Sequence, residues 1–358
     1  MAASATKDEI IRGLRGAGKE VSTLASNGGQ TVVVLPYGGR VLGLFGAESS
    51  SNFFWTHPAL AAAETARELY ESGRWHNSGG DRTWLAPERD YFYPDFPDTS
   101  RYVQPTQFDA GQFDVAVLNN QRIELRTAFT LRSYRAAADL RLELTKAVSF
   151  TADPLAAKSS PLAADKLEFA GYRLETSLVA ADPLAEDACV GIWNLLQLPG
   201  GGAMFAPTYF RTEPTIFFGD IPAGHVRVED RFVRYQMEAP AEQKICISAL
   251  ASTGRLGYLR QEGDAWVLVV RDFRIDPTGA YRDVWPTRIE DDGYAVQICN
   301  INAEYLGYFA ELEYHAPALC SGSEAQTSRD VSDVWAYRGE REAIAAAAKC
   351  LLGVDVFE

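Results

Sequence analysis

The sequence predicts an all-β protein, a large sandwich of antiparallel sheets with a few short peripheral helices. The first observation is that apolar and polar residues alternate along many segments, as in strands with one buried face. The second is that turn-forming clusters separate these segments: LPYGG, VLNNQ, QLPGGG, GDIPAG, RQEGD and IEDDG. No βαβ rhythm and no linker interrupts this pattern, so we expect a single domain over residues 1–358.

The clearest strand segment covers residues 121–132, which read QRIELRTAFTLR. Ile123 and Leu125 would face one way and Arg122 and Glu124 the other, because successive side chains of a strand point to opposite faces of the sheet. The same alternation predicts strands over three further segments, 140–150, 225–238 and 308–315.

Three segments predict helices at the periphery. Residues 7–24 carry apolar residues at helical spacing and belong to an N-terminal helical extension over residues 1–24. Residues 58–71 and 338–352 are rich in Ala, Glu and Arg. Gly353 follows the last of these segments, where a helix would end.

The charge of the chain narrows the choice of partners. The formal net charge is −14 and the isoelectric point is near 4.9. No run of Lys and Arg stands out in the sequence. Nucleic acids and anionic membranes both require a basic surface, so we expect neither as a partner.

The cysteines and the first residues bear on the compartment. The five cysteines are widely separated and form no CxxC pair or Cys/His cluster with zinc spacing. The first residues lack the apolar stretch of a secretory signal. In GLRGAGKE (13–20), which approaches a phosphate-binding loop, Glu20 stands where a magnesium-binding Ser or Thr is needed. We expect a cytoplasmic protein with reduced cysteines, no metal and no cofactor.

A polar, Gly-rich stretch, WHNSGGDRTWLAPERD (75–90), contains the first candidate site residues. His76, Asp81, Arg82 and Glu88 offer hydrogen-bonding groups, and Trp84 offers a flat apolar face. Sugars need this mixture, because their hydroxyls take paired hydrogen bonds and their C–H faces stack on indole rings. The alternative is a buried turn in which Arg82 pairs with Asp81 or Glu88 and the tryptophans fill the core.

Further candidates lie on predicted strands. In GYFAELEYHAP (307–317), the side chains of Glu311, Glu313 and His315 share one face of a strand, either towards solvent or into a cleft where a carboxylate can act as a general base. Other polar or aromatic groups that could bind a sugar are Trp193, Asn194, Gln197, Lys244, Arg271 and Gln297.

The order of several motifs resembles that of the aldose 1-epimerase (galactose mutarotase) superfamily, in particular its uncharacterised bacterial branches. GGRVLGLF (38–45) and NFFWTHP (52–58) resemble the opening strands of that superfamily, and HNSGGDRTWLAPE falls where its His-Gly-Gly loop stands. WNLLQLP and GYFAELEYHAP resemble its later segments, the second of which carries the catalytic glutamate.

This resemblance implies a mutarotase-like supersandwich with a cleft for a small-molecule or oligosaccharide carbohydrate. It also implies acid–base chemistry, with His76 nearest to the first family histidine and Glu311 or Glu313 nearest to the glutamate base. The family's main acid histidine is missing from IWNLLQ, where Trp193 and Gln197 cannot donate a proton as an imidazolium does. His225 or His315 could replace it. A carbohydrate-binding protein without catalysis, or a lyase or hydrolase on the same scaffold, stays open as an alternative.

Overall fold

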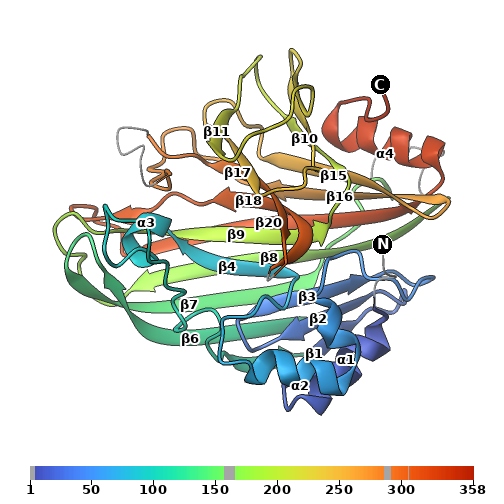
Figure 1. Ribbon diagram of the computed structural model, residues 1–358. Helices are drawn as coiled ribbons and strands as arrows, with labels where there is room; N and C mark the ends of the chain where they lie inside the picture. Colours follow the sequence, from blue (N-terminus) through green and yellow to red (C-terminus); the bar gives the residue numbers. More distant parts are fainter. Residues whose placement is uncertain (1–4, 157–165, 286–291, 305) are drawn as a thin grey trace.

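Two antiparallel sheets form the body of the protein in the computed structural model, which describes residues 5–156, 166–285, 292–304 and 306–358. All pairings between the described strands are antiparallel. The all-β prediction is therefore confirmed (Figure 1).

The first sheet contains the strands that later form the candidate site. Its order is β1 (Ser22–Ala25), β2 (Thr31–Leu35), β3 (Arg40–Phe45), β4 (Asp81–Ala86), β9 (Cys189–Pro199), β18 (Gly307–His315), β17 (Val296–Ala303), β14 (Gln243–Ile247) and β11 (Thr215–Phe218), with the short β19 (Leu319–Cys320) paired to β9.

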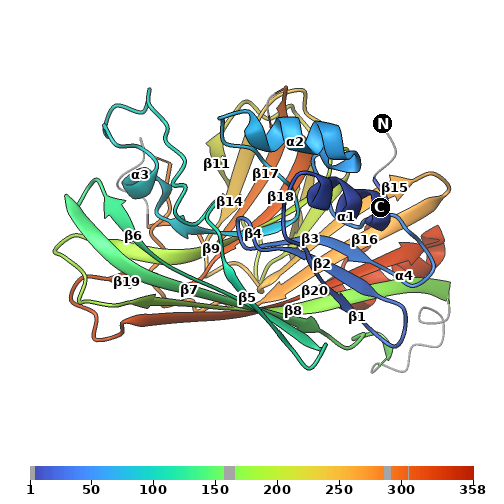
Figure 2. The ribbon, with the colours of Figure 1, turned by 90° about the horizontal axis from the view of Figure 1, so that it is seen from below.

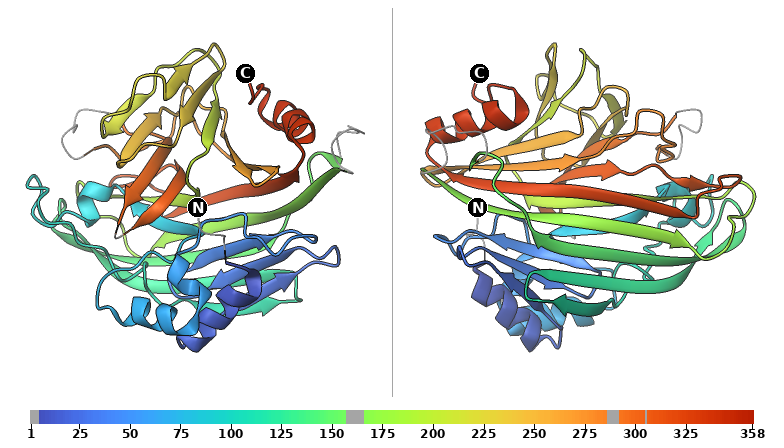
Figure 3. Two further views of the ribbon diagram at one scale, coloured as in Figure 1. Left: turned by 45° about the vertical axis from the view of Figure 1, so that its right-hand side comes forward. Right: turned by 180° about the vertical axis from the view of Figure 1, so that it is seen from behind.

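The second sheet contains the longest strands, which cross the molecule side by side in the right panel of Figure 3. Its order is β12 (Val226–Val228), β13 (Phe232–Gln236), β10 (Ala203–Pro207), β15 (Arg255–Glu262), β16 (Ala265–Phe273), β20 (Thr327–Gly339), β8 (Leu167–Ala180), β7 (Ala138–Phe150), β6 (Arg122–Ser133) and β5 (Asp114–Leu118).

Three of the four strand predictions correspond to β6, β7 and β18 within a few residues. The fourth, over residues 225–238, is wrong in one respect, because this segment forms a hairpin of β12 and β13 with Val226 opposite Tyr235. The polar residues Glu229 and Asp230 lie at the turn. Because these two residues fit the alternation of polar and apolar residues on either side, the sequence carries no sign that the chain reverses here.

The helices are short and flank the sheets. They are α1 (Lys7–Gly16), the 3-10 helix η1 (Pro58–Ala61), α2 (Ala63–Glu71), α3 (Glu88–Tyr91) and α4 (Arg341–Leu352). The predicted helix over residues 7–24 is shorter than expected, because the chain enters β1 at Ser22. A capping box between Thr6 and Glu9 starts α1, and Gly353 ends α4 with φ 77°.

A continuous apolar core lies between the two sheets and includes Tyr91 of α3, whereas α1, α2 and α4 pack outside it. Ile10 of α1 and Ala66 of α2 pack with Val33 and Leu42 on the outer face of the first sheet. Ile344 of α4 packs against the outer face of the second sheet. Figure 2 shows α1 and α2 on the far side of the first sheet from the long strands. Among the described residues, no helix has the length and apolar character that crossing a bilayer requires.

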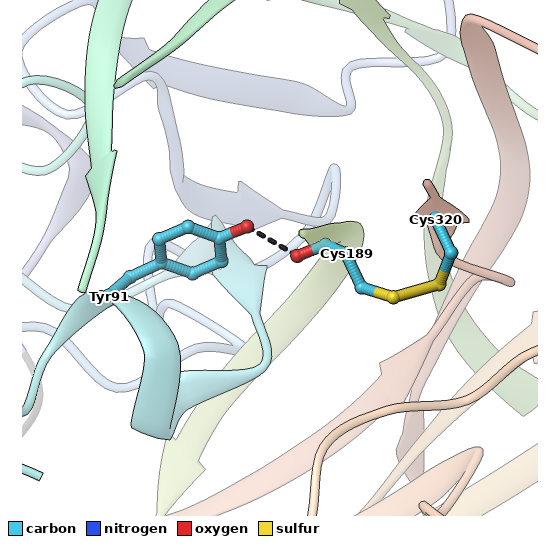
Figure 4. The surroundings of a disulfide bond; sticks show 3 residues. All are labelled: Tyr91, Cys189 and Cys320. Atoms are coloured by element: carbon cyan, nitrogen blue, oxygen red, sulfur yellow. Dashed lines mark hydrogen bonds between the residues drawn. A yellow bond between two sulfur atoms is a disulfide. The ribbon is translucent and has the colours of Figure 1, made fainter. Parts of the chain in front are cut away.

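One disulfide links the ends of two strands of the first sheet. Cys189 at the start of β9 is bonded to Cys320 of β19, and the hydroxyl of Tyr91 donates a hydrogen bond to the carbonyl of Cys189 (Figure 4). The expectation that all the cysteines are reduced is therefore wrong for this pair. Disulfides persist mainly in oxidising compartments. The cytoplasmic location stays a prediction, and this bond argues against it.

Candidate functional site

A cleft of about 560 Å³ opens on the outer face of the first sheet. This volume lies within the range of about 300–1,000 Å³ that is usual for small-molecule sites. Its aromatic lining comes from Trp75, Trp84, Tyr93, Tyr102, Trp193, Phe218, Trp285 and Phe309. Its charged lining comes from Arg82, Glu88, Glu242, Lys244, Glu311 and Glu313.

Strand alternation decides which residues reach the cleft. On β4, Arg82 and Trp84 line the cleft, whereas the intervening Thr83 points into the core, where it donates a hydrogen bond to Asn194 Oδ1 at 2.6 Å. On β18, Glu311 and Glu313 line the cleft, and Leu312 between them belongs to the core. Glu311 and Glu313 therefore share one face of β18, as the sequence alternation predicts.

Two glycines bring β4 into position beneath the cleft. Gly79 and Gly80 have φ values of 96° and 78°, which other residues rarely adopt. A Cβ atom on Gly79 would lie 2.4 Å from the carbonyl oxygen of Trp55, and one on Gly80 would lie 2.3 Å from that of Val41. The Gly-Gly pair therefore permits the chain to pass close to its neighbours just before Asp81.

Glu311 accepts two hydrogen bonds on the floor of the cleft. Arg82 Nη2 and Gln197 Nε2 donate to its Oε1 atom at 2.9 Å and 2.8 Å. The Arg82 guanidinium lies over the Trp84 ring, 3.8 Å from its centroid. The indole nitrogen of Trp84 in turn donates to Asp109 at 2.6 Å. This support fixes Arg82 beside Glu311, where the guanidinium forms an ion pair with the carboxylate at 2.9 Å.

Glu313 lies beside Glu311 and has a different environment. Its Oε2 atom is 2.8 Å from the indole nitrogen of Trp193 and 2.8 Å from Lys244 Nζ, while Oε1 has no hydrogen-bond partner. Burial raises the pKa of Glu313 to about 7, although Lys244 acts in the opposite direction. This carboxyl can therefore hold or release a proton near neutral pH.

A chain of polar groups continues behind Glu313. Lys244 Nζ donates to Gln297 Oε1 at 2.7 Å, and Gln297 Nε2 donates to Asp283 at 2.6 Å. Asp283 also accepts from the backbone nitrogen of Glu88 at 2.7 Å, at the start of α3. Gln297 is thus a support for Lys244 and is not among the residues that line the cleft.

The two histidines that sequence analysis put among the catalytic residues lie outside the cleft lining. His315 is buried, stacks on Trp193 and lies 4.0 Å from Asp283. Burial lowers the pKa of His315 to about 4, so the ring is neutral at neutral pH. His76 stacks on Tyr37, with its Nε2 atom 3.2 Å from the tyrosine hydroxyl. The structure therefore does not bring His76 to Glu311 and Glu313.

Three predicted sugar-binding residues lie in the core between the sheets, which corrects their assignment. Asp81 pairs with Arg271 of the second sheet at 3.0 Å, and Asn194 donates a hydrogen bond to Tyr314 at 2.8 Å. Asp81, Asn194 and Arg271 are all fully buried. Strand alternation turns Asp81 away from its neighbour Arg82 on β4, and Asn194 away from Trp193 on β9. Arg271 lies on β16 of the second sheet and reaches Asp81 from the opposite side of the core.

Sequence reasoning missed several lining residues. Glu242 stands two positions before Lys244, and Cys299 stands two positions after Gln297, so strand alternation could have placed both. Tyr102 and Trp285 lie in irregular segments, where no periodicity indicates direction.

One group of side chains in the cleft could in principle hold a metal. Cys299, Glu311 and Glu313 each offer a ligand atom, and these atoms lie within 4.8 Å of one another. Arg82 and Lys244 already balance the charge of the two carboxylates. A divalent cation would have to displace these ion pairs, so the donor set does not fit a resident metal well.

Glu88 provides a test of the electrostatics of the cleft. Burial raises its pKa from the ordinary value of 4.5 to about 7. Between these pH values the folded protein binds more protons than the unfolded chain, so this group lowers stability as the pH rises. We expect Glu88→Gln to gain melting temperature relative to the wild type when the pH is raised from 5 to 8. The exposed Glu71→Gln should show no such gain, and an equal response of both variants would contradict this prediction.

The fold and the cleft define a class of antiparallel β-sandwich proteins with a polar, aromatic-walled cleft on the outer face of one sheet. The chain belongs to a family of unknown function (DUF6786), which matches residues 12–358. No curated protein matches its sequence.

Several solved structures have a similar arrangement. A galactose mutarotase related enzyme from Lactobacillus acidophilus is 10% identical with a TM-score of 0.48, covering 88% of this chain and 96% of its own. A GalM/aldose epimerase homologue from C. elegans is 9% identical with a TM-score of 0.45, covering 90% and 99%. A galactose 1-epimerase from Lactobacillus acidophilus NCFM is 9% identical with a TM-score of 0.45, covering 89% and 94%. The names of these structures are those of mutarotase and aldose epimerase relatives, and at 9–10% identity the likeness concerns the fold alone.

Proposed function

We propose that the protein binds a carbohydrate in the cleft and interconverts its anomers by acid–base chemistry. The observation that carries the proposal is the pair of buried carboxyls, Glu311 and Glu313, which stand side by side among aromatic walls. Glu311 forms an ion pair with Arg82 at 2.9 Å, and Glu313 can carry a proton near neutral pH. A base and an acid are therefore available within one small volume.

In the proposed step, the two carboxyls act on the two oxygen atoms that are bonded to the anomeric carbon. Glu311 takes the proton of the anomeric hydroxyl, while Glu313 gives its proton to the ring oxygen, and the bond between this oxygen and the anomeric carbon breaks. The product is the open-chain aldehyde. After rotation of the aldehyde, the reverse transfers close the ring to the other anomer and return both protons. The ring oxygen and the hydroxyl share one carbon, so neighbouring carboxyls can serve both.

Glu313 replaces the expected histidine as the acid in this proposal. The ring of His315 is neutral, and Trp193 lies against it, so it supports the cleft from behind. The remaining predicted residues keep distinct roles. Arg82 and Gln197 orient Glu311, Lys244 and Trp193 orient Glu313, and Trp84 and Glu88 form part of the wall.

A second candidate is carbohydrate binding without turnover. It is favoured by the fact that no histidine lines the cleft among the described residues. The cleft then serves only to hold a sugar through its aromatic faces and paired polar groups.

The experiment that tests both candidates uses the full chain and a panel of reducing sugars, each dissolved as a single anomer. Binding is measured by tryptophan fluorescence, since Trp75, Trp193 and Trp285 line the cleft. Anomer interconversion is followed by NMR against buffer alone. We expect at least one sugar to bind and to interconvert faster. Binding without acceleration would favour the second candidate, and a panel without any binding would overturn both.

A further inference from the structure

The charges that line the cleft are not balanced. Four carboxylates, those of Glu88, Glu242, Glu311 and Glu313, face two cations, Arg82 and Lys244, among the described lining residues. The pairs Arg82–Glu311 at 2.9 Å and Lys244–Glu313 at 2.8 Å use both cations. Glu88 and Glu242 are therefore left without a cationic partner in the part of the lining that the structure describes.

Two carboxylate oxygens in the described lining of the cleft also lack hydrogen-bond donors. The Oε1 atoms of Glu242 and Glu313 are buried and have no partner, and the Glu313 side chain is fully inaccessible to solvent. Glu88 accepts a hydrogen bond at 3.0 Å from the neutral hydroxyl of Tyr102. Buried polar atoms normally have a partner, so these two Oε1 oxygens indicate a donor that a ligand would bring. The Nε and Nη1 atoms of Arg82 also lack a partner among the described residues and could meet an acceptor of the same ligand, such as a sugar hydroxyl oxygen.

Burial is the main influence on three of the four carboxyls. It raises the pKa of Glu88, of Glu242 and of Glu313; a neighbouring anion raises each pKa further, whereas Lys244 lowers the pKa of Glu88 and of Glu313. An additional negative charge would increase this repulsion. An additional positive charge would relieve it.

We propose, resting on the proposed function, that the cleft selects basic amino sugars over neutral sugars and disfavours acidic ones. A protonated amine supplies three hydrogen-bond donors, which the unpartnered Oε1 atoms of Glu242 and Glu313 can accept. It also supplies one positive charge, which Glu242 lacks among the described lining residues, whereas Glu313 already has Lys244. A neutral sugar supplies donors but no charge. A uronate adds a further anion to a cleft in which carboxylates already outnumber cations.

The test compares matched sugars by calorimetric titration of the full chain near neutral pH. The first series is glucosamine, glucose and glucuronate, and the second is galactosamine, galactose and galacturonate. In the series that fits the cleft, we expect the amine to bind roughly ten- to a hundredfold more tightly than the neutral sugar, as for hydrogen bonds between charged groups. The uronate should bind more weakly than the neutral sugar.

Two variants assign the preference to the cleft. Glu242→Gln should reduce the advantage of the amine over the neutral sugar several-fold, because it removes one unbalanced charge and keeps the side-chain shape. The matched control, Glu324→Gln, changes an exposed carboxylate outside the cleft lining and should leave the advantage unchanged. Equal losses in both variants would overturn the assignment.

The outcomes separate this inference from the proposed function. Binding of neutral sugars with no advantage for the amine, or with equal binding of the uronate, would overturn the amino-sugar preference and leave carbohydrate binding standing. If no member of either series binds, and the wider panel also fails, the proposed function itself is overturned.

Discussion

Glu311→Gln lowers the rate of anomer interconversion by roughly 10²- to 10⁴-fold, the usual contribution of a general acid or base. The amide occupies the same space and can still meet Gln197 and Arg82, but it cannot accept a proton at neutral pH. NMR measurement of the exchange between anomers gives the rate, and circular dichroism checks that the variant is folded. An unchanged rate in a folded variant would exclude Glu311 as the base.

The pH profile provides the matching test for Glu313. Its pKa is about 7, and an acid must be protonated to act, so the wild-type rate should fall as the pH rises above about 7. Glu313→Gln should remove this fall together with most of the activity. A merely structural role would lower the amount of folded protein and leave the profile of the remaining activity in place.

Arg271→Met should cost about 3–5 kcal/mol in the free energy of unfolding, the usual result of leaving one partner of a buried ion pair behind. Asp81 and Arg271 are both completely buried, and their carboxylate and guanidinium groups meet through two contacts of 3.0 and 3.1 Å. The hydroxyl of Tyr172 also donates to Asp81 at 2.6 Å. Without the guanidinium, a charged Asp81 would remain between the sheets, so the loss should appear in urea denaturation curves.

A double variant and a neighbour serve as controls. The combination Asp81→Leu with Arg271→Met replaces both charges by apolar groups and should recover much of the lost stability. Neither variant should change sugar affinity while the protein is folded, because both residues face the core. By contrast, Arg82→Met changes a residue that lines the cleft, and it should therefore change sugar affinity. A loss of sugar binding in folded Arg271→Met would restore the sequence-based assignment of Arg271 to the site.

The alternation of β6, β7 and β18 was readable from the sequence because each strand carries a long, regular pattern of apolar and polar residues. This also placed Glu311 and Glu313 on one face of β18. The sequence could not say which face looks into the cleft, because all the residues from Phe309 to His315 are buried. In such a strand, polarity does not distinguish the core from a lined cavity.

The sequence could not predict which residues pair across long distances along the chain, for a different reason. Asp81 and Arg271 are 190 positions apart, and Cys189 and Cys320 are 131 positions apart. Local periodicity carries no information about which strands of two sheets face each other. Part of the position of Asp81 was nevertheless predictable, since neighbouring residues on a strand face opposite ways and Asp81 precedes Arg82. The Gly-rich stretch 75–90 resembles a loop, and in a loop this alternation is not expected.

Asp283 joins two parts of the cleft that the chain holds far apart. It accepts one hydrogen bond from Gln297, which supports Lys244 from behind the lining, and one from the backbone of Glu88 at the start of α3. The backbone of Glu88 and the support of Lys244 are therefore tethered to each other within the protein itself. A ligand that enters meets a site already in its working shape, so little of its binding free energy is spent on ordering the protein.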